Sequence, residues 1–417
     1  MNILFLTENF PPETNASATR VYERAVYWAK WGHQVTVITC APNFPGGKLH
    51  EGWKNRWRQE QMMDGIRVVR VKTFIAKNEG FLLRTLDFVS FMITATIAAL
   101  REPKPDVVAA TSPQFFAAVA GWMIGAMRKT PFVFELGDLW PRSIVAVGAM
   151  KDSPLIRALE RLELFLYRKA ECVTALTRTF RQDLIGRGIP AEKIAVVING
   201  VDLPRYAPRE RDEEMALTYD LTDKFVIGYV GTHGMAHGLI NVLDAAELLK
   251  DEDRLRFILV GAGAERKMLE KEAAVRGLPN VVFIPSQPKE RMPLVWSLCD
   301  VALVHLKNDP VFAEVIPSKI FEAMGMGLPL LCVSPRGEAS FIIETDQAGL
   351  WVPAGDPPAF AAAARRLLDD VNLRTYHRDK SLAAAPEHSR EKQAALMLRV
   401  LDLAAQRRGS ECKGVDG

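Results

Sequence analysis

The sharpest chemical pattern lies in the second half of the chain, which reads Glu314-Val315-Ile316-Pro317-Ser318-Lys319-Ile320-Phe321-Glu322-Ala323-Met324-Gly325-Met326-Gly327-Leu328-Pro329. Proline suits the first position of a helix, so the pattern predicts a helix over residues 317–326, between two apolar runs. Ser318 and Lys319 would lie in its first turn, where unpaired N–H groups attract anions. Glu314 precedes this helix and Glu322 lies further along it. One helix start would therefore present an ammonium group and two separated carboxylates.

Short apolar runs and amphipathic runs alternate on both sides of this stretch. In the second half, strands are expected at 225–230, 255–260, 281–284, 301–305, 329–333 and 350–352, and helices at 240–250, 264–276, 289–298, 317–326 and 358–370. In the first half, strands are expected at 3–7, 34–40, 66–71, 106–110, 132–135, 172–176 and 194–198, and helices at 19–31, 81–100 and 155–170. This alternation predicts parallel sheets with helices on both faces.

A polar interruption divides the chain into two doubly wound, Rossmann-like α/β domains. A length of 417 residues is enough for two or three domains. We expect an N-terminal domain over residues 1–202, a linker over 203–224 and a second domain over 225–388, with 370–387 irregular. A helix over 389–407 would complete the first domain, and residues 408–417 would fray. Because ligands bind beyond the carboxyl ends of such strands, the two domains would face a central cleft.

The composition is that of an ordinary globular protein, with 48% hydrophobic and 25% charged residues. The 53 basic and 50 acidic residues nearly cancel, which gives a formal net charge of +3. A protein devoted to binding nucleic acid would be more basic, so no nucleic-acid partner is expected. Residues 1–7 are interpreted as a buried strand and not as a signal peptide. Thr111-Ser112-Pro113-Gln114 interrupts the charge-free run over 107–127, which favours a strand, a turn and a helix over a membrane span.

The cysteines suggest a reducing compartment. The chain contains Cys40, Cys172, Cys299, Cys332 and Cys412. None forms a C-x-x-C pair, which argues against a disulfide framework or a zinc ribbon. The first four lie in or beside apolar runs, where a thiol behaves as a small core side chain. This pattern favours the cytoplasm.

Two glycine-containing turns follow predicted strands in the second half. They contain Gly231, Gly234, Gly261 and Gly263. Neither ends in Gly-Lys-Ser/Thr, and neither completes a dinucleotide fingerprint, so a P-loop is excluded and nicotinamide chemistry is disfavoured. The first turn could face a phosphate or pack a helix closely against a strand. It could also hold a metal through His233 and His237, although no carboxylate lies nearby in the sequence.

These motifs together resemble the glycosyltransferases of the GT-B fold, family 4. That family carries two glutamates separated by seven residues, matched here by Glu314 and Glu322. Further motifs follow in the order and spacing of the family, namely Asn199-Gly200-Val201-Asp202, Gly261-Ala262-Gly263 and Gly327-Leu328-Pro329. The strings Asp138-Leu139-Trp140-Pro141, Gly234-Met235-Ala236-His237-Gly238-Leu239 and Ile316-Pro317-Ser318-Lys319 resemble one branch of the family. That branch includes the UDP-N-acetyl-L-fucosamine transferases of O-antigen and capsule assembly.

The resemblance implies roles on the donor side. Glu322 would bind the ribose hydroxyls of the nucleotide, and Glu314 would hold the donor sugar in the catalytic site. The nucleotide and its diphosphate would be bordered by Gly231, Gly234, His237, Gly261, Gly263, Pro317, Ser318, Lys319, Ile320 and Glu322. Many relatives carry an arginine and a lysine where this chain has Thr232 and His237. Lys319, with or without His237, would replace these two cations as the catalytic positive charge.

On the acceptor side, Asn15, Ala16 and Trp140 are the residues that the resemblance implies. Relatives often have paired glycines in the loop that contains Asn15 and Ala16. Asp138 is a candidate catalytic residue that positions the acceptor, or else it caps the following turn. The D-x-D-like string Asp251-Glu252-Asp253 is interpreted as a solvated turn. No metal and no cofactor is expected, because protein charges and dipoles would stabilise the leaving diphosphate.

A basic stretch in the first half suggests a membrane partner. Residues 48–77 are rich in lysine and arginine, with Trp53 and Trp57 interleaved, and a very apolar helix begins near Phe81. Basic residues and tryptophans beside an apolar surface suit an anionic membrane. A solvated loop next to a core helix is the alternative interpretation.

The sequence and the resemblance therefore predict a metal-independent, retaining glycosyltransferase. It would move a sugar, an N-acetylated amino sugar by branch resemblance, from a UDP-sugar to a polyprenyl-diphosphate-linked or saccharide acceptor in bacterial surface polysaccharide synthesis. Its place would be the cytoplasm, peripherally on the inner face of the membrane. The alternatives are a GDP-sugar-dependent mannosyltransferase, a UDP-sugar 2-epimerase-like enzyme and a non-catalytic nucleotide-sugar-binding protein.

Overall fold

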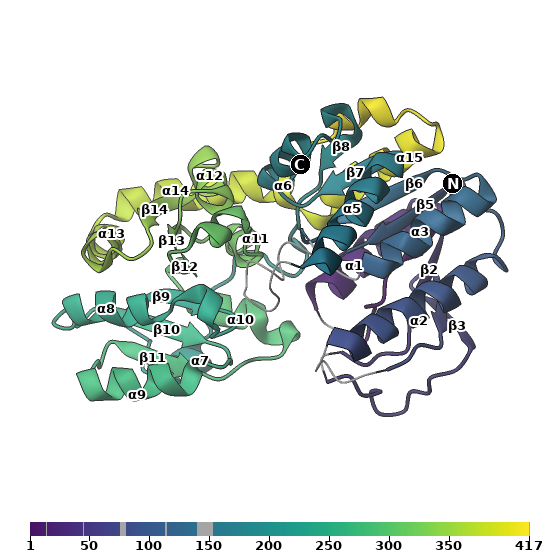
Figure 1. The fold of residues 1–417 in the computed structure, drawn as a ribbon. Helices are drawn as coiled ribbons and strands as arrows, with labels where there is room; N and C mark the ends of the chain where they lie inside the picture. Colours follow the sequence, from purple (N-terminus) through teal and green to yellow (C-terminus); the bar gives the residue numbers. More distant parts are fainter. Residues whose placement is uncertain (14, 45, 76–80, 113–114, 140–152, 417) are drawn as a thin grey trace. The chain divides into compact units, whose positions relative to one another are not determined.

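The computed structural model describes residues 1–13, 15–44, 46–75, 81–112, 115–139 and 153–416. The chain forms two compact units, one of Met1–Asn199 with Arg390–Gly417 and one of Gly200–Ser389. Each unit is built on a sheet of mostly parallel strands with helices packed on it (Figure 1). The prediction of two Rossmann-like α/β domains is confirmed.

The N-terminal unit has an eight-stranded sheet in the order β3-β4-β2-β1-β5-β6-β7-β8. The strands are β1 Asn2–Leu6, β2 Gln34–Cys40, β3 Arg58–Met63, β4 Ile66–Val71, β5 Val107–Thr111, β6 Phe132–Leu136, β7 Cys172–Ala175 and β8 Ile194–Val196. All neighbours pair in parallel except β3 and β4. Strand β3 was not predicted, because its sequence is polar and an edge strand need not be apolar.

Helices cover both faces of this sheet. They are α1 Ala16–Lys30, α2 Phe81–Ala99, α3 Phe115–Arg128, α5 Pro154–Lys169, α6 Arg178–Gly186 and α15 Arg390–Ala405, with 3-10 helices η1 Ala191–Lys193 and η6 Gly409–Gly414. Leu4 and Leu6 share a core with α2, α3 and α5, whereas Ile3 and Phe5 share one with α1 and α15. Alternate residues of a strand point to opposite faces, so burial on both faces explains the continuous apolar runs.

The C-terminal unit has a six-stranded, all-parallel sheet in the order β11-β10-β9-β12-β13-β14. The strands are β9 Phe225–Val230, β10 Leu255–Val260, β11 Val281–Ile284, β12 Val301–His305, β13 Leu330–Ser334 and β14 Gly349–Pro353. The α-helices are α7 Glu213–Thr218, α8 Ile240–Leu248, α9 Arg266–Arg276, α10 Met292–Ser297, α11 Lys319–Gly325, α12 Glu338–Thr345, α13 Pro357–Asp369 and α14 Val371–Ala384. The 3-10 helices are η2 Met235–His237, η3 Lys289–Arg291, η4 Pro310–Glu314 and η5 Ala385–His388.

Residues 370–387 are not irregular, because most of them form α14. The side chain of Asp370 caps this helix by accepting the N–H of Leu373 at 2.8 Å. The pattern was missed because the buried face of α14 carries polar residues. Ser381 donates to the carbonyl of Leu328 at 2.9 Å, and His377 is buried beside the carbonyl of Gln347.

The expected linker over 203–224 belongs to the C-terminal unit. It contains α7, and its Tyr206 and Leu221 are buried. The carbonyl oxygen of Tyr206 lies so close to α11 that a Cβ at Gly325 would be 2.8 Å away. The unit therefore begins at Gly200 and not at residue 225.

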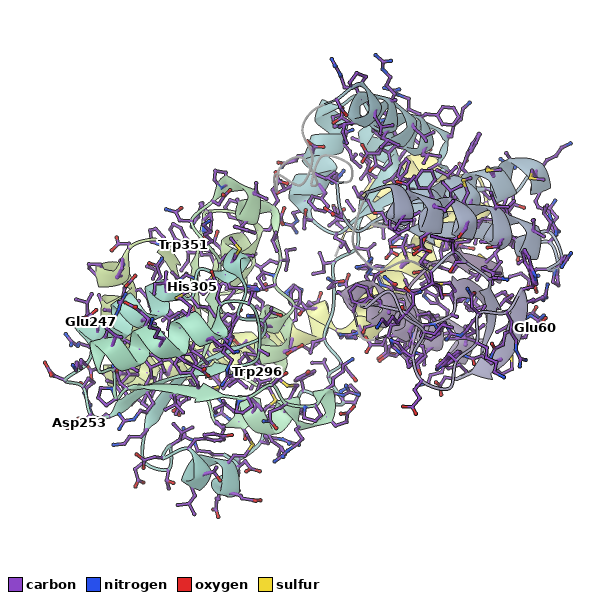
Figure 2. The ribbon with its side chains drawn as sticks, turned by 60° about the horizontal axis from the view of Figure 1, so that its bottom comes forward. Glu60, Glu247, Asp253, Trp296, His305 and Trp351 are labelled. Carbon is purple, nitrogen blue, oxygen red and sulfur yellow. A yellow bond between two sulfur atoms is a disulfide. The ribbon has the colours of Figure 1, made fainter. Side chains whose placement is uncertain are left out.

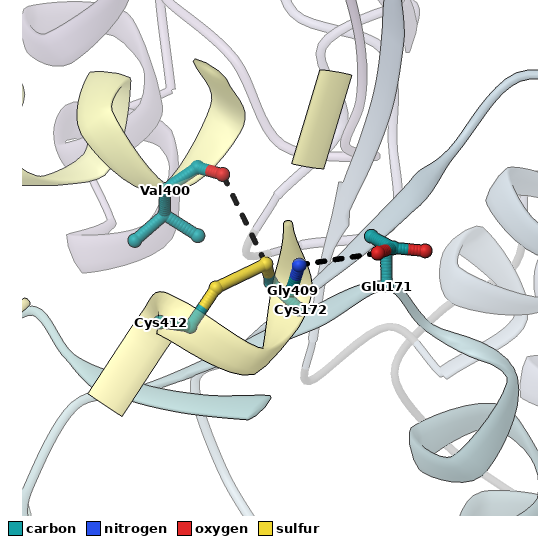
Figure 3. The surroundings of a disulfide bond; sticks show 5 residues. All are labelled: Glu171, Cys172, Val400, Gly409 and Cys412. Atoms are coloured by element: carbon teal, nitrogen blue, oxygen red, sulfur yellow. Dashed lines mark hydrogen bonds between the residues drawn. A yellow bond between two sulfur atoms is a disulfide. The ribbon is translucent and has the colours of Figure 1, made fainter. Parts of the chain in front are cut away.

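The end of the chain does not fray. Residues 409–414 form η6, and Cys412 and Val415 are fully buried in the N-terminal unit. Gly409 donates its N–H to Glu171 at 3.1 Å (Figure 3). A Cβ at Gly409 would lie 2.2 Å from the carbonyl oxygen of Glu171, so this contact requires glycine.

Contrary to the sequence-based expectation, two cysteines are joined. Cys172 of β7 and Cys412 of η6 form a disulfide across 240 residues of sequence, with Cα atoms 6.5 Å apart (Figure 3). Spacing along the chain could not reveal the pair, because only the return of the C-terminal segment brings the two together. Cys40, Cys299 and Cys332 are free and buried.

Within the described ranges, no helix is long and apolar enough to cross a membrane. The charge-free run over 107–127 forms β5 and α3, as predicted.

A buried ion network anchors the carboxyl end of β6. Glu135 accepts from Arg20 at 3.1 Å and from Arg24 at 2.5 Å, and all three side chains are almost fully buried. Arg24 also donates to the carbonyl of Ile198 at 3.0 Å, which ties α1 to the end of the unit. Burial alone would raise the pKa of Glu135, but the two guanidinium groups outweigh it and hold the pKa below its ordinary value.

Glu135→Gln should lower the free energy of unfolding of the N-terminal unit by about 3–5 kcal/mol, because two buried guanidinium groups lose their counter-charge. Urea denaturation followed by circular dichroism measures this loss. Glu60→Gln is the matched control, because its ion pair with Arg58 is partly exposed and contributes at most about 1 kcal/mol. Equal effects of the two substitutions would contradict the importance of the buried network.

Candidate active site

The strand order of the C-terminal unit marks where a ligand binds. Strand β9 lies at the centre, with β10 on one side and β12 on the other, so the chain reverses its direction of progress across the sheet there. Crevices at the carboxyl ends of strands at such a switch point are the usual ligand sites of doubly wound folds. The predicted donor residues follow β9, β10 and β12.

The two glycine turns are packed backbone to backbone. The N–H of Gly231 donates to Val260 and the N–H of His233 donates to Ala262, both at 2.9 Å. A Cβ at Gly261 would lie 1.9 Å from the carbonyl oxygen of Gly231, and one at Gly263 would lie 2.3 Å from that of His233. Both glycines also have positive φ values, of 145° and 158°. Close packing therefore requires glycine at both positions.

Lys319 is the most unusual group of this site. Its residue is only 9% exposed, and its Nζ has no hydrogen-bond partner among the described residues. The Nζ lies 3.5 Å from the centroid of the Tyr229 ring, and a Cβ at Gly231 would be 2.9 Å from it. Burial lowers the pKa of Lys319 to about 7, although the Glu322 carboxylate acts in the opposite direction.

Three histidines surround this lysine. His233 and His305 are fully buried, and His237 is half-buried. Burial, reinforced by the positive charge of Lys319, lowers the pKa of each to about 4, so all three are neutral at pH 7. Nδ1 of His305 lies 2.6 Å from the carbonyl oxygen of His237, so we assign its proton there. No group of three possible metal ligands occurs in the part of the chain that the structure describes.

Several ring nitrogens of these histidines are buried without a hydrogen-bond partner among the described residues. They are both ring nitrogens of His233, Nδ1 of His237 and Nε2 of His305. Unpaired buried polar atoms are costly in a folded protein. Together with Nζ of Lys319, they form a set of groups that a polar ligand would satisfy.

Glu322 is held in place by two aromatic donors. Its Oε2 accepts the indole N–H of Trp296 at 3.1 Å, and the Tyr206 hydroxyl also hydrogen-bonds to this carboxylate. Burial raises the pKa of Glu322. Figure 2 shows Trp296 and His305 within the C-terminal unit, whereas the exposed Glu247 and Asp253 lie at its surface.

The other predicted donor-side residues take varied positions. Helix α11 begins at Lys319, two residues later than predicted, so Pro317 and Ser318 precede it, and Ser318 is the residue before its first turn. Ile320 points into the core, which leaves only its backbone for a ligand. Glu314 ends η4. Gly234 precedes η2, the short helix that contains His237.

The acceptor-side residues belong to the N-terminal unit. Asn15 caps α1 by accepting the N–H of Ala18 at 2.9 Å, and Ala16 is the first residue of that helix. Asp138 follows β6, and its N–H donates to Ser112 at 3.4 Å. Trp140 lies outside the described residues. The turn that contains Asp253 is exposed, as predicted.

Sequence reasoning missed the groups that support the donor residues. Tyr229 beneath Lys319, His305 at the end of β12, and the donors Trp296 and Tyr206 were not identified. Each lies in a segment interpreted as strand, helix or linker, and each makes its contact across the fold. A tyrosine at the end of a buried strand is a weak signal for a polar site, and the other residues offered none.

Comparison with known proteins agrees with this geometry. The "Glycosyl transferase 4-like domain" model matches residues 15–200, and the "Glycosyl transferases group 1" model matches residues 211–381. The chain is 29% identical over 338 residues to the "Putative colanic acid biosynthesis glycosyl transferase WcaI" of Escherichia coli K12, covering 78% of this chain and 82% of that protein. It is 25% identical to the "GDP-mannose-dependent alpha-mannosyltransferase" of Mycobacterium tuberculosis, covering 85% of each.

Solved structures share the fold. Sucrose-phosphate synthase from Thermosynechococcus elongatus has a TM-score of 0.75 at 16% identity, covering 96% of this chain and 98% of that one. Anabaena Alr3699/HepE in complex with UDP has a TM-score of 0.70 at 18% identity, covering 96% of this chain and all of that one. The fold and the two family models thus define a glycosyltransferase of the GT-B type. The two models together span most of the chain, which belongs to the glycosyltransferases of family 4.

Proposed function

We propose that this glycosyltransferase transfers a sugar from a UDP-sugar to a lipid-linked or saccharide acceptor in bacterial surface polysaccharide synthesis. One observation carries the donor assignment. A buried lysine, with no anionic partner among the residues that the structure describes, lies at the switch point of the sheet, on the same helix as a carboxylate held by two donors. A diphosphate would supply the missing negative charge, and a ribose would supply hydroxyls for the carboxylate.

The chemistry follows from where charge develops. As the bond from the sugar to the diphosphate breaks, negative charge grows on the leaving oxygen. A cation fixed beside that oxygen stabilises the transition state more than the ground state. Lys319 would supply this charge without a metal, Glu322 would bind the ribose, and Glu314 would hold the donor sugar. Asp138 would position the acceptor for a reaction that retains the anomeric configuration.

The relatives support the polysaccharide assignment. One is named for colanic acid biosynthesis and another, from Bacillus subtilis, for teichuronic acid biosynthesis. We propose a polyprenyl-diphosphate-linked saccharide as the acceptor, used at the cytoplasmic face of the membrane, and an N-acetylated amino sugar as the transferred group. The matched Anabaena protein was crystallised with UDP-glucose, which favours UDP. Relatives named as GDP-mannose-dependent mannosyltransferases make a GDP-sugar the second candidate.

Release of nucleotide from a panel of UDP- and GDP-sugars tests the function. We expect UDP release from at least one UDP-sugar, stimulated by a lipid-linked saccharide and unchanged by excess EDTA. Release from GDP-mannose alone would favour the second candidate. Turnover that EDTA abolishes and magnesium restores would show that a metal performs the task assigned to Lys319.

Glu322→Gln should weaken UDP binding about 10- to 150-fold, because a charge-assisted hydrogen bond to a ribose hydroxyl contributes about 1.5–3 kcal/mol. Isothermal titration calorimetry on both proteins measures the change. Glu247→Gln is the control, because this glutamate is exposed and pairs with Arg276 on the surface. An unchanged affinity for UDP in Glu322→Gln would reject the ribose assignment.

Helix α2 supports the proposed membrane contact. Leu83, Leu86, Ile93 and Ile97 are each about half exposed, and their spacing places them on one face of the helix. Trp57 is 72% exposed, and Lys72 lies 5.1 Å from its ring centroid. Phe74, which follows Lys72 in the sequence, donates its backbone N–H to the hydroxyl of Ser90 in α2 at 2.7 Å. The basic stretch therefore lies next to α2. Helix α2 also contributes Phe91 and Ala95 to the core of the N-terminal unit, so it is a core helix on one face, as the alternative interpretation expects, and exposed on the other.

Binding to anionic vesicles should fall as salt rises, because each basic residue near the surface contributes about 1 kcal/mol that salt screens. Cosedimentation with phosphatidylglycerol vesicles measures it. Leu86→Glu with Ile93→Glu should abolish binding, whereas Val275→Glu, at an exposed apolar residue of the other unit, should leave it unchanged. Binding that ignores lipid charge, salt and the double substitution would reject the membrane proposal.

A further inference from the structure

In the part of the chain that the structure describes, no negatively charged group contacts Nζ of Lys319 directly. The face of the Tyr229 ring covers it on one side, and the Tyr229 hydroxyl is already committed to the carbonyl of Thr232 at 2.8 Å. The backbone of Gly231 closes another side. Glu322 acts on Lys319 from a distance, since no contact of ion-pair length joins these two described residues.

The titratable groups around Lys319 come from four elements. His233 lies in the turn after β9, His237 in η2, His305 at the end of β12, and Glu322 on α11 itself. Each additional proton here would repel the others in a region that excludes water. The cluster as a whole therefore resists positive charge until an anion arrives.

Charged groups further out do not change this balance. Arg266 and Glu270 act on the pKa of His233 in opposite directions, with Arg266 the stronger of the two, and Lys289 acts on Glu322. Among the described residues, the carboxylate that acts on Lys319 is that of Glu322, which accepts from Trp296 and hydrogen-bonds with Tyr206. An anion from outside is the strongest partner that the ammonium group could gain.

We propose that Lys319 is largely neutral in the ligand-free protein above neutral pH and takes up one proton from solvent when the donor's diphosphate binds. This inference rests on the proposed donor site and adds how that site is charged. The proton passes from water or buffer acid to the lone pair of Nζ, and no bond of the diphosphate is made or broken. The bound anion then holds the proton in place for the bond-breaking step.

Lys319, and not a histidine, is the group that gains the proton. Its pKa of about 7 in the empty site lies close to working pH, so a nearby diphosphate readily shifts it into the charged form. Burial lowers the pKa values of His233, His237 and His305 to about 4, far below working pH, so these side chains stay neutral where Lys319 titrates.

The sign of the pH dependence follows from linkage. A group whose pKa is higher in the complex than in the free protein strengthens binding below its free pKa and loses that contribution as pH rises. Affinity for UDP should therefore fall about tenfold per pH unit above about pH 7.5. UDP itself adds no pH dependence there, because its terminal phosphate, with a second pKa of about 6, is already ionised. Below about pH 6.5 protonation of this phosphate contributes as well, so the test uses the range above pH 7.

Isothermal titration calorimetry of UDP binding, repeated in two buffers of different ionisation enthalpy, gives the number of protons that the protein takes up on binding. At pH 8 we expect uptake of close to one proton per UDP in the wild type. Lys319→Arg should bind UDP without proton uptake, because a guanidinium group stays charged, and Lys319→Met should bind weakly without uptake. Lys250→Met, at an exposed lysine, is the control and should behave as wild type. Circular dichroism confirms that each variant is folded.

A second measurement needs no ligand. In protein labelled with ¹³C at the lysine Cε, the signal missing from Lys319→Met should titrate near pH 7 in the free state and above pH 9 with UDP bound. A free-state midpoint near 10, or UDP binding without proton uptake, would overturn the inference while leaving the proposed function intact. Failure of both UDP and GDP to bind at any pH would overturn the proposed function and the inference with it.

Discussion

The amino group of Lys319 is buried against an aromatic ring, with no anion in contact among the described residues, and the proposed donor site is organised around that constraint. A buried charge is expensive, and a lysine responds by releasing its proton. The protein tolerates this position because Gly231 leaves room for Nζ and Tyr229 offers the negative face of its ring. A ligand carrying a diphosphate would bind strongly at such a position. A low dielectric destabilises an isolated ammonium group, but it strengthens the attraction between that group and a phosphate anion.

The N-terminal unit shows the opposite solution to the same problem. Arg20 and Arg24 are as buried as Lys319, but both contact the carboxylate of Glu135. The positive charges of this network are neutralised within the chain, so the network stabilises the fold and needs no anionic ligand. The contrast separates two kinds of buried basic side chain in one molecule: the arginines paired with Glu135 stabilise the fold, and Lys319 is left for the proposed ligand.

Much of the architecture could be predicted from local pattern. Strands such as β2, β4, β9 and β10 were predicted at their observed bounds, because a strand buried on both faces must be continuously apolar. The predictions of secondary structure failed where a regular element is polar, or where polar side chains are buried. Strand β3 is a polar edge, α14 buries His377 and Ser381, and η6 is held by packing and by Cys172, far away in the sequence. In each, the stabilising partner lies outside the segment.

Local sequence patterns were enough to predict the two α/β units, the glycine turns and the position of Lys319 and Glu322 on one short helix, because strand, turn and helix patterns depend on neighbouring residues. The environment of those two side chains comes from long-range contacts that no local pattern contains. Tyr229, His305, Trp296 and Tyr206 reach them from β9, β12, α10 and the segment before α7. The pKa of a side chain depends on burial and on charges across space, and neither is written in the local sequence. The same lysine in a solvated first turn would be an ordinary cation, whereas here burial lowers its pKa to about 7.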